Sequence, residues 1–347
     1  MKLSHTENKK FLKIGAIILI FGLGFVISWF SHISPEIRPV TSIRENSSGY
    51  KFINPFILLK IPDEDTSPQF LALKNQIATY VNKSFTEKNA KNVSVYFREL
   101  NSISWISVNG DEKYSPASML KVASLIAFFR AVEIDPNLIH KEIRIAAGSL
   151  NSDTKQDYYV PTNPVKMGEI YTAKELLSRV AIDSDNNAAN VLSILAGKYL
   201  MDKTYTDLGI PLSVISSTED FISPRLYSRF FRALYNGTYL SHDLSEQTLE
   251  LLSKANFKNG LVAGVPSNTL VSHKFGERTF LIKHNSNIYP DETIRELHDC
   301  GIIYFPNNPY VLCIMTKGTD FSKLETIMKN ISSIAWNAVS AFDDLKK

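Results

Sequence analysis

The sequence predicts an α+β fold in which an antiparallel sheet, built from both ends of a folded region, packs against helices and is joined to an all-helical subdomain. Strand patterns occur near residues 93–108 and again within 270–316, with amphipathic helical patterns at both ends of the region. The middle, about residues 118–255, is mostly helical in pattern. An N-terminal transmembrane helix is expected to precede this fold.

The composition is that of an ordinary globular protein. The chain has 347 residues, of which 44% are hydrophobic and 21% charged, and this excludes disorder throughout, collagen and a disulfide scaffold. The net charge is only +3, and four of the lysines lie in the first thirteen residues. The remaining chain is close to neutral, so nucleic acid is not an expected partner.

The first element is an apolar segment at residues 14–33 that is long enough to span a membrane. It carries no formal charge apart from the weakly basic His32. It is longer than the apolar part of a cleaved signal peptide and ends without a small-x-small cleavage site, so we expect an uncleaved anchor. The preceding lysines predict a cytoplasmic tip at residues 1–13, a plasma-membrane location and an extracytoplasmic position for everything after Ile33.

A stalk is expected to follow the anchor. Residues 34–66 contain four prolines and an acidic run at residues 63–65, a composition typical of a linker, with one ordered piece expected at residues 52–59. Residues 67–347 then have the length of one large domain.

The folded domain is expected to begin with a helix at residues 71–85. Alternating apolar residues at 93–97 predict a half-buried strand, with which residues 105–108 are expected to pair. Further strands are expected near residues 270–275, 300–305 and 310–316. A final helix follows, with an apolar stripe from Leu324 to Ala338.

The two cysteines lie in neighbouring predicted strands. Cys300 and Cys313 flank the segment 306–309, Pro-Asn-Asn-Pro, which is typical of a hairpin turn. A two-residue turn there would place the cysteines diagonally on one face of the sheet. That arrangement allows a disulfide in an exported domain, and two buried free thiols are the alternative.

The first candidate for chemistry is a serine and lysine pair at the start of an apolar helix. Nearly every residue from Met119 to Phe129 is apolar, so this helix is expected to be buried all round, with Lys121 inside it. Pro116 places Ser118 at the helix N-terminus, and Lys121 follows on the same face. Burial disfavours the ammonium form, so Lys121 could act as a base toward Ser118, whereas a helix cap and a solvent-directed lysine are the structural alternative.

Two further motifs follow downstream. A capping box at Thr172–Glu175 opens a helix that runs into Ser184-Asp185-Asn186, which alone is typical of a turn between helices. Lys274 precedes Gly276 on a strand, where a backbone could approach a ligand closely, although a strand-end lysine in solvent is the simpler interpretation. A second Ser-x-x-Lys, at residues 152–155, lies in a polar stretch and is assigned to a solvated loop.

Together these motifs resemble those of the penicillin-recognising serine hydrolases, most closely the class A β-lactamases. Ser-x-x-Lys at Ser118 is followed after 66 residues by Ser-Asp-Asn, and after 90 more by Lys-x-Gly, in the order of that family. The similarity covers about residues 70–345 and includes flanking stretches at 171–172, 223–225 and 299–304. It implies a β-lactamase/transpeptidase-like fold.

The resemblance implies a role for each matching residue. Ser118 would be the nucleophile that opens an amide to give an acyl-enzyme, and Lys121 would be its base. Ser184 would relay the proton to the leaving nitrogen. The resemblance implies no cofactor, and the seven histidines show no metal-ligand spacing, so no metal site is expected either.

The same resemblance assigns the substrate-binding residues. Asn186 would hold the side-chain amide of the substrate, and Lys274 would attract its carboxylate and help to keep the nearby lysine deprotonated. The backbone amides of Ser118 and Glu277 would form the oxyanion hole beside Gly276.

The sequence departs from the family pattern at two places. The family has Thr or Ser after the strand lysine, to bond the substrate carboxylate, but this chain has Phe275. The Glu-x-x-Leu-Asn loop of class A enzymes, whose glutamate activates the deacylating water, is absent between Asn187 and Ser223. Glu219 or Asp220 could replace that base, although capping of the next helix is the favoured role for an acid there.

The sequence therefore predicts a membrane-anchored, outward-facing serine hydrolase of the class A β-lactamase type, with a monomeric catalytic domain and a β-lactam or peptidoglycan-like small substrate. The missing glutamate motivates an alternative, a penicillin-binding D-alanyl-D-alanine peptidase with slow deacylation. Phe275 motivates another, a degenerate module that binds peptidoglycan without turnover.

Overall fold

The computed structural model describes residues 50–53, 64–146, 156, 158–215, 220–283 and 290–344. The predicted cytoplasmic tip and anchor, residues 1–33, lie outside this part of the chain. Within the described residues, no helix combines the length and the apolar character needed to cross a bilayer.

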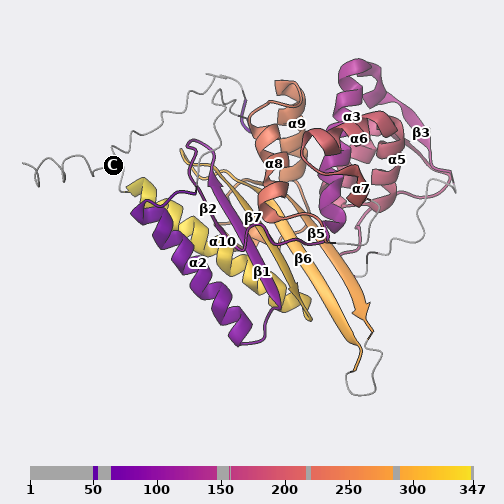
Figure 1. Cartoon of the computed structure of the whole chain (residues 1–347). Helices are drawn as coiled ribbons and strands as arrows, with labels where there is room; N and C mark the ends of the chain where they lie inside the picture. The colour runs from indigo at the N-terminus through magenta and orange to yellow at the C-terminus, as the bar shows by residue number, and fades with distance from the viewer. Residues whose placement is uncertain are drawn as a thin grey trace, which may run out of the picture. The chain divides into compact units, whose positions relative to one another are not determined.

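A five-stranded antiparallel sheet lies at the centre of the folded region (Figure 1). Its strand order is β2-β1-β7-β6-β5, so strands from the two ends of the domain pair with each other. This confirms the predicted α+β class and the predicted origin of the sheet. The strands are β1 (Asn92–Glu99), β2 (Trp105–Val108), β5 (Val271–Ile282), β6 (Glu292–Ile303) and β7 (Tyr310–Gly318).

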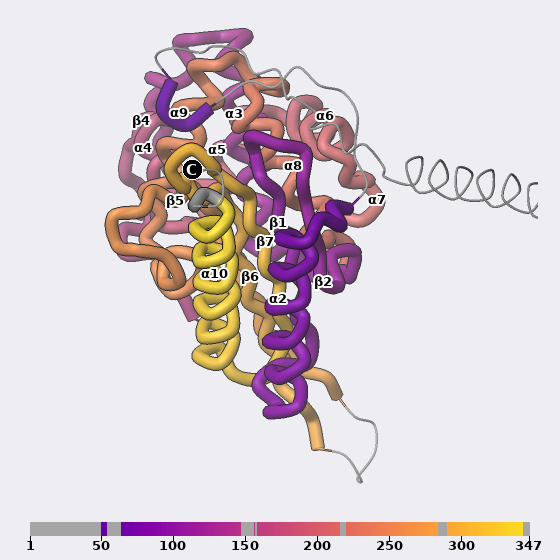
Figure 2. The backbone as a smooth tube through the Cα atoms, turned by 90° about the vertical axis from the view of Figure 1, so that its left-hand side faces the viewer, coloured from indigo at the N-terminus to yellow at the C-terminus, as the bar shows by residue number. Residues whose placement is uncertain are grey.

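The first and last helices cover one face of this sheet. α2 (Pro68–Thr86) and α10 (Phe321–Asp344) lie side by side, as Figure 2 shows. Their apolar stripes, represented by Leu73 and Leu324, pack with strand residues such as Phe97. Helical apolar periodicity at both ends of the domain therefore predicts this layer correctly.

The opposite face carries the helices of the middle segment. α8 and α9 lie next to the sheet, with α3, α5 and α6 beyond them (Figure 1). α3 is buried along most of its length, as its largely apolar sequence predicts. The helices of this part are α3 (Lys121–Ile134), α4 (Ala173–Ser178), α5 (Asn186–Ala196), α6 (Lys198–Asp207), α7 (Leu212–Ile215), α8 (Pro224–Tyr235) and α9 (His242–Ser253).

Shorter elements complete the described chain. The capping box predicted at the start of α4 is present, with Thr172 and Glu175 bonding each other's backbone amides. A small separate sheet pairs β3 (Glu142–Arg144) with β4 (Ile170–Thr172). Single turns of helix are η1 (Ala117–Leu120), η2 (Pro136–His140), η4 (Arg179–Asp183) and η5 (Leu261–Gly264).

Two details of the sheet correct the sequence prediction. β1 is buried on both faces rather than half-buried, because α8 packs against the face opposite α2 and α10. β5 and β6 have 12 residues each and form a hairpin that runs well beyond the predicted strand ends.

The cysteines lie directly opposite each other, not diagonally. β6 and β7 are joined by six residues rather than a two-residue turn, and the resulting register pairs Cys300 with Cys313. The two form a disulfide, with their Cα atoms 4.0 Å apart. Of the two alternatives that the sequence leaves open, the structure has the disulfide.

Parts of the segment that we assign to the stalk contact the folded region. Three consecutive backbone amides, from Lys51 to Ile53, donate hydrogen bonds to the carboxylate of Glu246 on α9 at 2.7–3.0 Å. Glu64 is the first described residue after residue 63, and its carboxylate accepts a hydrogen bond from the Ser107 amide. Of the ordered piece expected at residues 52–59, only residues 52–53 lie within the described chain, and both are buried.

Candidate active site

Ser118 lies on a tight turn directly before the buried helix α3. The turn is η1, which Pro116 precedes, and the Met119 amide donates to the Pro116 carbonyl at 3.0 Å. Ala117 has φ 46°, a left-handed conformation that is unfavourable for a residue with a side chain. The predicted helix N-terminus is thus a strained turn, and it leaves Ser118 half-buried rather than enclosed.

Lys121 is the first residue of α3 and joins two of the predicted site serines. Its Nζ donates to Ser118 Oγ at 2.9 Å and to Ser184 Oγ at 3.1 Å, and it also bonds the Ser184 carbonyl oxygen. Burial lowers the pKa of Lys121 to about 7, although the charges of Asp185 and Glu277 oppose this shift. A large fraction of Lys121 is therefore neutral near pH 7 and able to accept a proton.

Ser184 is held in a strained backbone conformation at the end of η4. Its φ of 58° and ψ of 32° are left-handed, and the residue is fully buried. The next residue, Asp185, caps α5 by accepting bonds from the Asn187 and Ala188 amides at 2.7 and 3.0 Å. The Ser-Asp-Asn segment is thus a turn between helices, as its composition predicts, and it also directs the Ser184 hydroxyl toward Lys121.

Lys274 is fully buried on β5, so the solvent-exposed alternative for this residue is wrong. Its Nζ donates to Ser184 Oγ at 2.7 Å and to the Phe275 carbonyl at 2.9 Å. Burial and the nearby Lys121 hold the pKa of Lys274 well below its usual value. A continuous hydrogen-bonded chain therefore runs from Ser118 through Lys121 and Ser184 to Lys274.

Gly276 allows β5 to approach the turn that carries Ser118. A Cβ at this position would lie 2.6 Å from the Pro116 carbonyl oxygen and 2.8 Å from Met119 Cγ. Only glycine fits there without displacing the backbone. The next residue, Glu277, is half-buried, and its carboxylate accepts a bond from the Tyr159 amide at 3.0 Å. Asn186, the first residue of α5, is also half-buried.

Phe275 belongs to an aromatic cluster that the sequence does not reveal. Its buried ring stacks on Phe257 at 4.4 Å and meets Tyr159 edge to face at 4.9 Å. The family has a small hydroxyl residue at this position, whereas this chain has a buried cluster of three aromatic rings. We call the cluster of Tyr159, Phe257 and Phe275 the aromatic wall. Lys274 Nζ lies 4.3 Å from the centre of the Phe275 ring, so the wall adjoins the hydrogen-bonded chain.

His298 positions the backbone just before Ser118, and the sequence does not reveal this role. The ring is buried on β6, its Nε2 bonds the Ser115 carbonyl at 3.0 Å, and the Thr316 amide donates to its Nδ1 at 3.2 Å. These partners require a neutral ring that carries its proton on Nε2. Burial lowers its pKa to about 4. This role depends on the strand register that places His298 opposite Gly276, and that register exists only in the folded sheet.

His298 should make the folded state acid-sensitive. Its folded pKa lies below the unfolded value of 6.5, so its stabilising contribution is complete above pH 6.5 and is lost as the pH falls toward about 4. The full difference corresponds to about 3 kcal/mol. Urea unfolding at pH 7.5 and 4.5 should show a smaller loss of stability for His298→Gln than for the wild type. The exposed His140→Gln is the control, and an equal loss in all three proteins would contradict this role.

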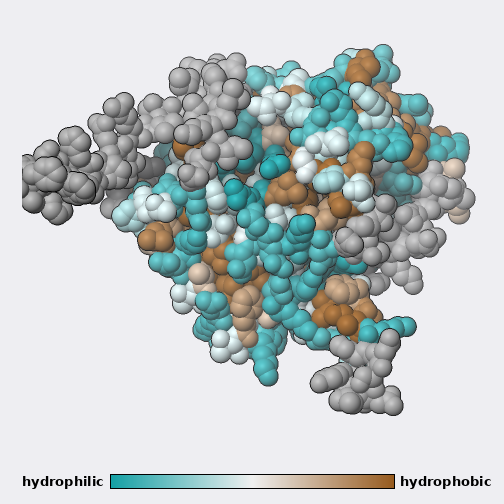
Figure 3. All heavy atoms as spheres, viewed as in Figure 1, coloured by the Kyte–Doolittle hydropathy of each residue, from teal (hydrophilic) through white to brown (hydrophobic). Residues whose placement is uncertain are grey.

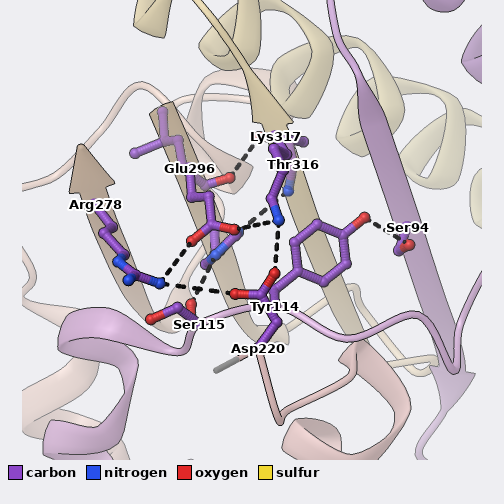
Figure 4. Close-up of polar contacts among 10 residues, drawn as sticks. Ser94, Tyr114, Ser115, Asp220, Arg278, Glu296, Thr316 and Lys317 are labelled. Atoms are coloured by element: carbon purple, nitrogen blue, oxygen red, sulfur yellow. Dashed lines mark hydrogen bonds and ion pairs between the residues drawn. The ribbon is translucent and has the colours of Figure 1, made fainter. Parts of the chain in front are cut away.

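Asp220 is neither a helix cap nor a partner of Ser118. Ser223 caps α8, accepting a bond from the Leu226 amide at 3.2 Å. Asp220 instead pairs with Lys317 at 2.6 Å and Arg278 at 3.7 Å, as Figure 4 shows. The capping role expected for this acid is therefore wrong, because the cations of β5 and β7 hold the carboxylate. The other candidate, residue 219, lies outside the described residues.

Metal binding finds no support in this part of the molecule. Within the described ranges, no group of three or more His, Cys, Asp or Glu side chains is arranged to hold a metal ion. The second Ser-x-x-Lys motif, at residues 152–155, lies outside those ranges.

Comparison with known proteins identifies a family and a set of similar folds. The model of the "Beta-lactamase enzyme family" matches residues 72–339. Among solved structures, PBP-A is 21% identical and covers 81% of this chain and 100% of its own, with a TM-score of 0.63. A variant of PBP-A, solved as an acyl-enzyme complex with penicillin G, is 20% identical, covers 78% of this chain and 97% of its own, and has a TM-score of 0.61.

A class A β-lactamase representative from Bacteroides cellulosilyticus is 16% identical, covers 78% of this chain and 99% of its own, and has a TM-score of 0.61. At these identities the likeness is one of fold. Comparison with curated proteins gives no match.

Proposed function

This chain is a β-lactamase-related serine hydrolase, a member of the beta-lactamase enzyme family, and from that premise we propose that it opens a β-lactam or a related amide through an acyl-Ser118 intermediate. One observation carries the proposal. Lys121 Nζ, with a pKa of about 7, bonds the Ser118 hydroxyl at 2.9 Å and the Ser184 hydroxyl at 3.1 Å. A base therefore contacts both the nucleophile and the proton relay.

In the proposed acylation, Ser118 Oγ attacks the amide carbonyl carbon and gives its proton to neutral Lys121. The bond between the carbonyl carbon and nitrogen then breaks. The leaving nitrogen takes a proton from Ser184, which regains one from Lys121, so the enzyme is left acylated and in its initial protonation state. Buried Lys274 lies 2.7 Å from the Ser184 hydroxyl, and its positive charge, when present, disfavours protonation of Lys121.

The remaining residues would bind the substrate. The backbone amides of Ser118 and Glu277 would stabilise the oxyanion, an arrangement that requires the close approach of β5 at Gly276. Asn186, which follows the relay segment at the start of α5, would hold the substrate's side-chain amide. The aromatic wall at Phe275 supplies no hydroxyl for a substrate carboxylate, which leaves that recognition to Lys274.

Slow deacylation is favoured because Asp220, the acid that could have replaced the missing glutamate, is held in ion pairs. Asp220 is bound to Lys317 and Arg278, and no Glu-x-x-Leu-Asn sequence is present to activate a hydrolytic water. A penicillin-binding D-alanyl-D-alanine peptidase is therefore the second candidate. The PBP-A variant with a similar fold, solved as an acyl-enzyme with penicillin G, fits this candidate. The third alternative, a module that binds peptidoglycan without turnover, needs no proton transfer. The two buried lysines that bond the Ser184 hydroxyl therefore argue against it.

Intact-mass spectrometry and turnover of a chromogenic cephalosporin distinguish the two activities. We expect penicillin G to form a covalent adduct with the full chain, and its lifetime decides between rapid and slow deacylation. Ser118→Ala should abolish the adduct. Ser152→Ala, which removes the serine of the other Ser-x-x-Lys motif, is the matched control and should react like the wild type. An unreactive wild type would refute the proposal.

The N-terminal segment is proposed to anchor the enzyme on the outer side of the plasma membrane. The supporting features are the twenty-residue apolar run at 14–33 and the four lysines that precede it. The full chain should then remain with the membrane after carbonate extraction. External protease should remove the domain from intact spheroplasts, and a fully soluble chain would contradict the anchor.

A further inference from the structure

Three arginines lie close together where α8 packs against β1, away from the residues proposed for catalysis. Arg98 is on β1, and Arg229 and Arg232 are on α8. Arg98 is only 6% exposed, Arg232 is half-buried and Arg229 is exposed. The three side chains therefore lead from the interior of the protein to the solvent. We call them the arginine cluster.

The strand register places Arg98 under α8. Arg98 lies opposite Trp105 on β2 and two residues after Tyr96, so these three side chains point to the same face of the sheet. The rings of Tyr96 and Trp105 stack there, with their centroids 5.7 Å apart. Tyr96 belongs to the core on the side of the sheet that α8 covers. Arg98 therefore points toward α8, beside an aromatic floor.

α8 carries a row of arginines along one side. Arg225, Arg229 and Arg232 occupy positions i, i+4 and i+7, which share one side of a helix. Arg225 shows which way this side points, because its guanidinium lies 4.5 Å from the centre of the Trp105 ring. A Cβ added at Gly209 would meet the Nη1 of Arg229. Gly209 therefore leaves room for the Arg229 guanidinium.

No carboxylate of the described residues balances the arginine cluster. Within that part of the chain, Arg98, Arg229 and Arg232 form no ion pair and donate no side-chain hydrogen bond. Burial and the charge of Arg98 lower the pKa of Arg232 to about 10, and the charge of Arg229 acts in the same direction. All three guanidinium groups are still charged at neutral pH, so the cluster brings three positive charges together.

Other arginines near this surface do have carboxylate partners. Arg225 pairs with Asp111 at 3.4 Å, and Arg130 pairs with Glu133. Placing like charges together in a partly buried position is unfavourable unless an opposite charge neutralises them. The arginine cluster therefore requires an anion that the described part of the chain does not supply.

The number of guanidinium groups indicates the kind of anion. Guanidinium groups bind carboxylate and phosphate through paired N–H donors. A carboxylate has two oxygens and one negative charge, so one guanidinium group satisfies it. A phosphate monoester has three terminal oxygens and nearly two negative charges at pH 7, so it can accept bonds from three guanidinium groups at once. The arginine cluster matches the phosphate better in both respects.

We propose that the arginine cluster binds the terminal phosphate group of a small phosphate monoester. β6 and β7 separate β1 from β5, the strand that carries Lys274, so this site is distinct from the acylation site. On the side of the molecule drawn in Figure 3, hydrophilic side chains reach the surface near α8 and the strands beside it. The inference does not depend on the proposed acylation of Ser118.

Inorganic phosphate is the first probe of the site. The full chain is titrated with phosphate at constant ionic strength, with chloride as the replacement anion. A ligand that binds only the folded state should raise the Tm, and the ³¹P line of phosphate should broaden. Both signals should saturate together, whereas general stabilisation by phosphate as a salt does not saturate. Absence of a saturable response in either measurement would overturn the proposal.

Substitutions assign the binding to the arginine cluster. Arg98→Gln and Arg232→Gln should each weaken phosphate binding about tenfold or more, because each removes a charge-assisted pair of hydrogen bonds. Arg229→Gln, at an exposed position, gives an independent test if the Arg98 variant folds poorly. Arg144→Gln is the control, because that side chain bonds the Gly168 carbonyl on β4's side of the small sheet, and it should bind phosphate like the wild type. Unchanged affinity in all the cluster variants would overturn the assignment.

Two soluble esters test which form of phosphate the site prefers. Glycerol 3-phosphate presents a terminal phosphate, whereas glycerophosphoglycerol presents a bridging phosphodiester of the kind found in lipid headgroups. The monoester should bind about tenfold more tightly, because it carries the larger charge and one more terminal oxygen. Competition with the ³¹P signal of inorganic phosphate gives both affinities. Tighter binding of the diester would overturn the assignment to a monoester.

Discussion

Replacing Lys121 by alanine should lower the second-order rate constant for acylation by penicillin G about 10³-fold or more, within the usual range for loss of a general base. The amine is the group that bonds both Ser118 and Ser184, so its loss leaves the nucleophile without a proton acceptor. Intact-mass time courses give the rate constant. Lys113→Ala, an exposed lysine before the same turn, is the control and should react like the wild type.

The pH dependence gives this prediction a second readout. Because burial lowers the pKa of Lys121 to about 7, the wild-type acylation rate should rise as the pH passes about 7 and level off above it. Only the neutral amine can take the Ser118 proton, which fixes the direction of the change. The residual reaction of Lys121→Ala should lack this step. An acylation rate that falls through this range would exclude Lys121 as the base.

Gly276→Ala should reduce acylation about 10²-fold or more, the usual effect of losing one oxyanion-hole donor. The added Cβ would lie 2.6 Å from the Pro116 carbonyl oxygen, so β5 has to move away from the nucleophile turn. The Glu277 amide would move with it and lose its position for the oxyanion.

The control for this variant is Gly318→Ala on β7, where the nearest atom is a side-chain methyl of Leu324 at 3.0 Å. That contact can relax, so acylation should be nearly unchanged. Thermal unfolding of both variants shows whether each remains folded. A Gly276→Ala protein that is folded and fully active would show that the close approach of β5 has no catalytic role.

Local patterns predict the layers of the fold. The apolar stripes of α2 and α10 and the largely apolar α3 each follow from residue spacing within one segment. The resemblance of the motifs to a family brought Ser118, Lys121, Ser184 and Lys274 together, which spacing alone could not do. Their hydrogen-bonded chain is the arrangement that such a resemblance leads one to expect.

What the sequence did not reveal depends on register and on contacts between distant segments. The disulfide and the role of His298 follow from how β6 pairs with its neighbours. The aromatic wall joins Tyr159, Phe257 and Phe275, which lie far apart along the chain. Asp220 looks like a cap because it precedes a helix, but Lys317, from the opposite end of the domain, decides its position.

The pairing of β1 with β7 has a consequence for how activity arises during synthesis. Ser118 and Lys121 are made early, but the strand that carries Lys274 is joined to β1 only through β6 and β7, and β7 begins more than 200 residues after β1 ends. Such distant pairing closes a long loop and folds late. A chain that has not yet reached β7 therefore lacks the assembled chain of hydrogen bonds from Ser118 to Lys274. Under the proposed mechanism, Ser118 would gain its nucleophilic character only after the last strand docks.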